Sequence, residues 1–141
     1  MITLAIDPGP TKCGWAVLDD KTYMFSGMFA STPEAIITFF KLDASELGIH
    51  RCLIEKPVVG RRQAAKLIHE TGIVTGFICG LGYGMGFRFG HVRAMDWRKQ
   101  LCGTHTASDK LIKECVEAVV LKLPAKTNEH TRDAMGLALY A

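Results

Sequence analysis

The sequence lacks a long apolar segment that could cross a membrane. Its longest stretch without a charged residue, residues 71–87, is rich in glycine and shorter than the roughly 20 apolar residues of a membrane-spanning helix. The amino terminus runs directly into an alternating strand pattern, so we expect no signal peptide. These absences predict a soluble cytoplasmic protein without a membrane partner.

Paired cysteines and nucleotide-binding loops are also missing. The five cysteines are scattered along 141 residues, and no C-x-x-C spacing occurs. The pattern indicates neither a zinc site nor a redox pair, and free thiols suit a reducing compartment. The stretch GFICGLGYGMGFRFG fails the G-x-G-x-x-G pattern in every register, so we expect no nucleotide cofactor. A net charge of +3 permits a polyanionic partner without requiring one.

What the sequence does contain is a succession of short strand patterns. Residues 1–7 alternate between apolar and polar positions, and residues 14–18 and 23–29 form two further apolar runs, separated by the turn residues 19–21. These three strands are close in sequence and are expected to be antiparallel. Residues 51–55 and 91–95 predict a fourth and a fifth strand.

Helix signals follow the first three strands. Thr32 and Pro33 begin a predicted helix that runs to about Leu47, and a second starts near Arg62. Alternating glycines at 80, 82, 84 and 86 suggest a flexible connection after it, although a helix end followed by a loop is the more common arrangement. Further helices are expected over residues 109–121 and from Asn128 to the end. The order predicts one α/β domain, residues 1–141, with helices layered on the sheet.

Three acids occupy positions that packing alone does not require. Asp7 ends the first strand, Glu55 ends the fourth, and Asp133 shares a face of the last helix with apolar residues. Taken singly, each has an ordinary explanation: a turn, a strand edge or a solvated face. If the two strands are neighbours, however, both carboxylates lie at the carboxyl edge of the sheet, where open α/β sheets bind ligands. The last helix would bring Asp133 to the same edge.

Converging carboxylates repel one another and therefore favour a bound cation. Hard oxygen ligands select magnesium or manganese over zinc. His130 lies three residues before Asp133 on the same helix face, and it could be a fourth ligand, a proton donor or an ordinary surface histidine. Such a cluster suits hydrolysis of phosphodiesters by two metal ions.

The acidic segments resemble, in order, the motifs of the RuvC family of Holliday-junction resolvases, within the RNase H-like superfamily. The matching segments are IDPGPTKCGWAVLD, LIEKP, SDKLIKECVEAVVLKLP and HTRDAMGLALYA. The resemblance implies a five-stranded mixed sheet flanked by helices, and a homodimer that nicks opposed strands of a four-way DNA junction. It also implies two Mg²⁺ ions per active site, replaceable by Mn²⁺, at the catalytic positions Asp7, Glu55, His130 and Asp133.

The resemblance further suggests surfaces for the partners. The helix after Glu55 would form much of the dimer interface, where Gly72 and Gly76 would allow close packing. Trp97 could stack on a base, although a core position is more common for tryptophan. Basic residues near these motifs are candidates for phosphate contacts, although such residues are more often a solvated surface; they are Arg61, Arg62, Arg98, Lys99 and Lys110.

Two departures from the family pattern and three alternatives accompany this interpretation. Val58 stands where bacterial relatives carry an aromatic wedge residue, and the chain is compact, which suggests a phage-type member. The acids alone would equally suit an RNase H-like nuclease acting on other branched DNA or on RNA. An actin-like ATPase half-domain would need a phosphate-binding loop that the sequence lacks. A catalytically silent nucleic-acid-binding module is the remaining alternative.

Overall fold

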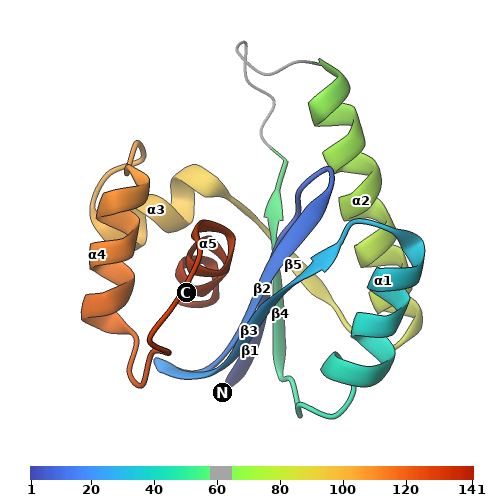
Figure 1. The fold of residues 1–141 in the computed structure, drawn as a ribbon, viewed down its shortest axis with the longest axis horizontal. Coiled ribbons are helices and arrows are strands. Elements are labelled where there is room, and N and C mark those ends of the chain that lie inside the picture. The colour runs from blue at the N-terminus through green and yellow to red at the C-terminus, as the bar shows by residue number, and fades with distance from the viewer. Residues whose placement is uncertain (58–64) are drawn as a thin grey trace.

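The computed structural model describes residues 1–57 and 65–141. Within these residues, five strands form one sheet in the order β3-β2-β1-β4-β5 (Figure 1). The first three strands form an antiparallel meander, whereas β4 runs parallel to β1 and β5 runs parallel to β4. The mixed sheet predicted from the sequence is therefore confirmed. The strands are β1 (Ile2–Asp7), β2 (Lys12–Asp19), β3 (Thr22–Ala30), β4 (Arg51–Lys56) and β5 (Phe89–Arg93).

Helices cover both faces of the sheet. Helices α1 and α2 lie on one face, and α3, α4 and α5 lie on the other (Figure 1). A π-helical segment, η1 (Phe39–Ala44), continues directly from α1. The helices are α1 (Pro33–Thr38), α2 (Ala65–Gly84), α3 (Ala94–Cys102), α4 (Asp109–Val119) and α5 (Glu129–Ala138). In the described parts of the chain, no helix is both long and apolar enough to cross a bilayer.

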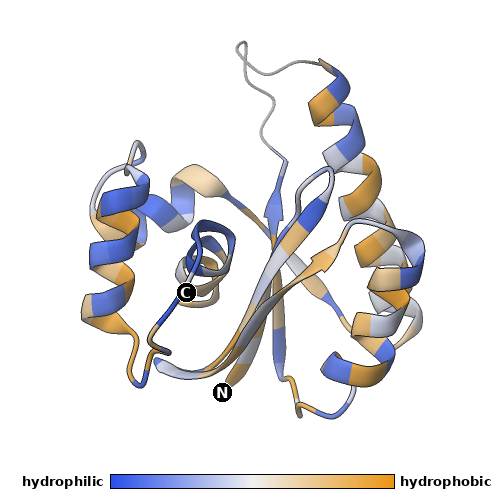
Figure 2. Cartoon of the chain, viewed as in Figure 1, coloured by the Kyte–Doolittle hydropathy of each residue, from blue (hydrophilic) through white to orange (hydrophobic). Residues whose placement is uncertain are grey.

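The period-two pattern of β1 divides its side chains between two cores. Leu4 and Ile6 pack with the aromatic residues of η1 and with Ile78 of α2. Ala5 faces the opposite way, into a core shared with α3, α4 and α5. Apolar residues, orange in Figure 2, accordingly run through the middle of the sheet. The alternation of the strand thus decides which helices each side chain meets.

Side-chain caps fix the helix starts that the sequence predicted. The Thr32 hydroxyl accepts a hydrogen bond from the Ala35 amide, and Pro33 occupies the first turn of α1. The Ser108 side chain caps α4 in the same way. Asn128 and Thr131 form a reciprocal capping box at the start of α5. Each cap satisfies an amide that the helix itself leaves unpaired.

Several boundaries differ from the prediction. The helix expected over residues 33–47 changes to π geometry at Phe39, where the adjacent Phe39 and Phe40 are both buried. At glycines 80–86 the structure has the favoured helix end and loop, because α2 continues to Gly84 and a turn follows at residues 85–86. The fifth strand starts at Phe89, two residues earlier than expected. Helix α3 was not predicted, and no side chain caps its start at Arg93.

Candidate active site

The carboxylates of Asp7 and Glu55 lie on the same face and at the same edge of the sheet. Strand β1 pairs in parallel with β4, with Ala5 opposite Leu53 and Ile6 opposite Ile54. One residue further along each strand come Asp7 and Glu55. Because Ala5 and Leu53 face the α5 side, period two places the two acids on that side as well. The sequence-based expectation that the two strands are neighbours is therefore correct.

Helix α5 brings the other two predicted residues to this edge. It packs across β1 and β2, and Gly14 of β2 permits the close approach. A Cβ atom at Gly14 would lie 2.5 Å from the backbone oxygen of His130, so a larger residue there would push the helix away. Gly14 pairs with Asp7 across the antiparallel β1–β2 ladder. The glycine thus allows the first turn of α5 to reach the end of β1.

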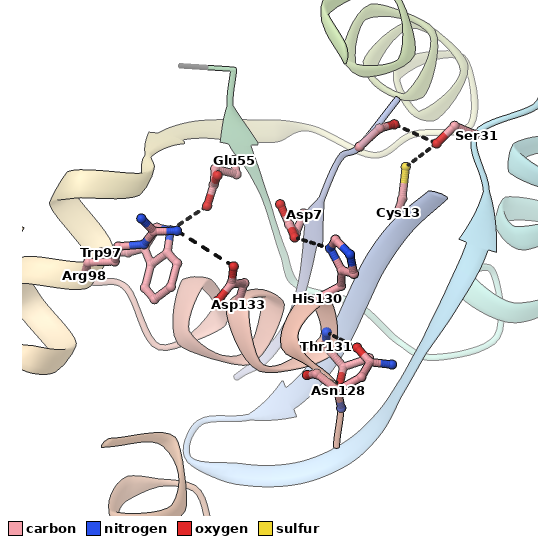
Figure 3. Close-up of polar contacts among 11 residues, drawn as sticks. Asp7, Cys13, Ser31, Glu55, Trp97, Arg98, Asn128, His130, Thr131 and Asp133 are labelled. Carbon is pink, nitrogen blue, oxygen red and sulfur yellow. Dashed lines mark hydrogen bonds and ion pairs between the residues drawn. The ribbon is translucent and has the colours of Figure 1, made fainter. Parts of the chain in front are cut away.

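Asp7 is largely buried and contacts the imidazole of His130. The His130 Nδ1 atom lies 3.3 Å from Asp7 Oδ2 (Figure 3). Burial raises the pKa of Asp7 to about 8, and repulsion from Glu55 and Asp133 acts in the same direction, opposed by Arg98. The three carboxylates are therefore close enough to disfavour their simultaneous ionisation.

Glu55 has a neutral hydrogen-bond donor as its partner. Trp97, on α3, donates its indole N–H to Glu55 Oε2 over 2.8 Å (Figure 3). Burial raises the pKa of Glu55, while the Trp97 hydrogen bond and the positive charge of Arg98 lower it. The sequence favoured a core position for Trp97, and the indole is indeed fully buried. Its contact with the candidate site was not foreseen.

Asp133 lies beside the guanidinium of Arg98. The Arg98 Nη2 atom is 3.8 Å from Asp133 Oδ2, and the Arg98 Nε atom is buried without a hydrogen-bond partner among the described residues. Burial raises the pKa of Asp133 to about 7; Arg98 opposes this shift and Glu55 adds to it. Each of the three acids thus has its own partner, namely His130, Trp97 or Arg98.

The chemistry of these donors suits a hard divalent cation, although their present arrangement does not complete a coordination shell. Three carboxylates with pKa values raised chiefly by burial and one imidazole are ligands that magnesium or manganese accepts. In residues 1–57 and 65–141, no three His, Cys, Asp or Glu side chains are arranged to hold one ion as they stand.

The predicted phosphate-binding residues fall into three groups. Arg98 points into the carboxylate cluster, whereas Lys99 on α3 and Lys110 in the first turn of α4 are exposed. Helix α3 and the start of α4 lie at the same edge of the molecule as the carboxyl ends of β1 and β4 (Figure 1). Arg61 and Arg62 lie outside the described residues, and so does Val58, the residue at the wedge position.

Three features of the site were not predicted. The role of Gly14 depends on how closely α5 approaches β2, and the Trp97–Glu55 contact depends on α3, which was itself not predicted. Glu129 also contributes, since its charge raises the pKa values of both Asp7 and Asp133. Its position beside His130 at the start of α5 was the only available sequence signal.

Comparison with solved structures relates this architecture to a known one. The structure of Thermus thermophilus RuvC matches with a TM-score of 0.78 at 17% sequence identity, covering 99% of this chain and 92% of that one. The chain has the RuvC fold. The structure of T. thermophilus RuvC in complex with a Holliday-junction substrate matches with a TM-score of 0.77, also at 17% identity, over 99% and 91% of the two chains.

Searches of protein-family models and of curated proteins found no match. The comparisons therefore relate this chain to RuvC through its structure, at 17% sequence identity. The expected fold class, an RNase H-like α/β domain with a five-stranded mixed sheet, is confirmed by that likeness.

Proposed function

We propose that this chain is a metal-dependent endonuclease that resolves four-way DNA junctions by paired nicks in opposed strands. The observation that carries the proposal is the meeting of Asp7, Glu55, His130 and Asp133 at the carboxyl edge of a RuvC fold. Residues separated by more than a hundred positions in the sequence form this cluster. Its buried, mutually repelling carboxylates have an energetic cost that a structural role does not explain.

Asp7, Glu55 and Asp133 would hold the divalent ions, with His130 beside them. When bound, two such ions activate a water molecule and stabilise the leaving oxygen of a phosphodiester. The chain itself orients the His130 ring. With Nδ1 of His130 directed at Asp7, Nε2 is the ring nitrogen left for ligation or for proton transfer. Manganese, with similar ligand preferences, should substitute for magnesium.

Branched DNA is the partner that this site and its surroundings suit. The related RuvC structure holds a Holliday-junction substrate. In this chain, α3 and the start of α4 lie at the edge that carries the acids (Figure 1), and the exposed Lys99 and Lys110 on these elements could contact phosphates. Such contacts would position the junction without reading its bases, and they would make binding fall with rising salt.

A second copy of the chain is the partner proposed for α2. Apolar residues continue along this helix in Figure 2, and Ile73 and Tyr83 are 60% and 64% exposed. Gly72 and Gly76 lie on the same helix, and a Cβ atom at either would meet nothing within 4 Å. A paired active site on two opposed DNA strands requires two copies, and this apolar helix offers them a contact surface.

The test is to separate cleavage from binding. We expect Asp7→Asn and Glu55→Gln to reduce junction cleavage by about 10³-fold or more, because several kcal/mol of charge stabilisation are lost at tenfold per 1.36 kcal/mol. Junction binding in a gel-shift assay should persist, since no basic residue is removed. Asp43→Asn, a change at an exposed acid on η1, is the matched control and should cleave normally.

Cleavage by either variant at the wild-type rate would contradict the site. Binding by the wild-type protein with no cleavage at any metal concentration would favour the catalytically silent module instead. Cleavage of an RNA strand or a simple flap in preference to the junction would favour another RNase H-like nuclease.

A further inference from the structure

Trp97 connects two of the acid-bearing elements of the candidate site. Its indole is fully buried on α3, and its N–H donates to Glu55 Oε2 at the end of β4 over 2.8 Å. The same ring packs against α5, where a Cβ atom at Gly136 would lie 2.6 Å from Trp97 Cζ3. Gly136 is three residues after Asp133 on that helix. One rigid side chain therefore contacts the strand of one acid and the helix of another.

The hydrogen bond from Trp97 differs in kind from the other contacts in the cluster. Arg98 carries a positive charge and therefore competes with a cation for the carboxylates. The indole N–H is neutral, so it can fix the orientation of Glu55 without cancelling its negative charge. Among the described residues, Oε1 of Glu55 has no hydrogen-bond partner, so the indole occupies one oxygen and leaves the other for ligation.

We infer that Trp97 is a positioning residue for metal binding: it holds Glu55 in orientation and sets the spacing between Glu55 and Asp133. The inference rests on the proposed function, because it requires these acids to be metal ligands. Outer contacts of this kind typically change metal affinity by about 10- to 100-fold when they are removed. The rigid, fully buried ring supplies the fixed geometry that such an effect needs.

The experiment replaces Trp97 with 3-benzothienylalanine, in which sulfur takes the place of the indole N–H at nearly the same shape. Mn²⁺ binding to the DNA-free protein is measured by electron paramagnetic resonance, and thermal unfolding is measured in EDTA. We expect Mn²⁺ to bind about 10- to 100-fold more weakly, with a melting temperature close to that of the wild type. The same replacement at Trp15, on the opposite face of the sheet, is the control and should bind Mn²⁺ normally.

The outcomes separate the inference from the proposed function. Unchanged Mn²⁺ affinity in the folded Trp97 variant would overturn the inference and leave the metal site intact. Absence of Mn²⁺ binding to the wild-type protein would overturn the proposed function itself. If the variant does not fold, the inference is tested instead on the wild-type protein, through the indole ¹⁵N–¹H NMR resonance of Trp97. It should shift during a Mg²⁺ titration while that of Trp15 does not, and an unmoved Trp97 resonance would overturn the inference.

Discussion

At the scale of single residues, the clearest feature is a group of buried carboxylates whose ionisation destabilises the folded protein when no metal ion is bound. The pKa of Asp7 is raised to about 8 and that of Asp133 to about 7, chiefly by burial. A carboxyl group with a raised pKa binds more protons in the folded state than in the unfolded state. The free energy of unfolding therefore falls as pH rises from the ordinary carboxyl pKa to the raised value.

This linkage predicts how Asp7→Asn changes stability. In EDTA at pH 8, we expect the variant to be more stable than the wild type by about 1 kcal/mol or more, since each pKa unit corresponds to 1.36 kcal/mol. For a domain of this size, 1 kcal/mol is about 4 °C in melting temperature. The difference should shrink as pH falls toward 4. Calorimetric scans from pH 4 to 8 test this, and a wild type that gains stability relative to the variant on going to pH 8 would contradict it.

The positions of Asp7, Glu55 and Asp133 could be predicted at the residue scale because each is an acid where its element should be apolar or should end. The partners of these acids could not be predicted. Arg98 was expected to contact phosphates, yet its guanidinium lies beside Asp133. Trp97 was expected in the core, but its indole N–H also donates a hydrogen bond to Glu55, which the sequence did not indicate. Such contacts depend on packing between α3 and the sheet, which no local sequence pattern contains.

At the scale of elements, the close approach of α5 to β2 delivers His130 to Asp7. Gly14 permits this approach, and the turn after β1 is held from the other side, where the Ser31 hydroxyl donates to the Gly9 carbonyl oxygen over 2.7 Å. The strands and the capped helices were predictable from period and capping residues. The π segment and α3 were not, because no side-chain cap marks the start of either one.

Gly14→Ala is therefore expected to displace the first turn of α5. The added methyl group would meet the His130 backbone, and overpacking of this kind costs about 1–3 kcal/mol. Cleavage should fall as well, because His130 and Asp7 move apart. Thermal unfolding and junction cleavage measure the two effects. Gly84→Ala is the control, since its methyl group would meet open space; equal behaviour of the two variants would contradict this role for Gly14.

Gly76→Lys tests α2 as the contact between copies. Nothing lies within 4 Å of a Cβ atom at this position, so the monomer fold should tolerate the change, and lysine favours a helix over glycine by roughly 0.5–1 kcal/mol. We expect the proposed dimer to dissociate in light scattering and paired nicking to be lost. A Gly76→Lys protein that remains dimeric at the same concentration would place the interface elsewhere. Gly76→Ala is the conservative control.

At the scale of the whole molecule, the RuvC fold positions one cluster of acids at the edge where α3 and the start of α4 also lie, and these elements carry the exposed Lys99 and Lys110. The sequence predicted this architecture because its strand and helix patterns follow one another in a consistent order, and the acids recur at equivalent ends. It could not predict the contact proposed between two copies or the DNA branch proposed as their substrate. Those properties depend on surfaces rather than on the pattern of buried residues.

The most direct test of the central claim is strand nicking, with and without Mg²⁺, on a synthetic four-way junction, a fork and a linear duplex of matched sequence. We predict Mg²⁺-dependent, symmetric nicks in two opposed strands of the junction and none in the duplex, with EDTA abolishing the reaction. Equal cutting of all three substrates, or cutting of none, would contradict a junction resolvase while leaving the RuvC fold unchanged.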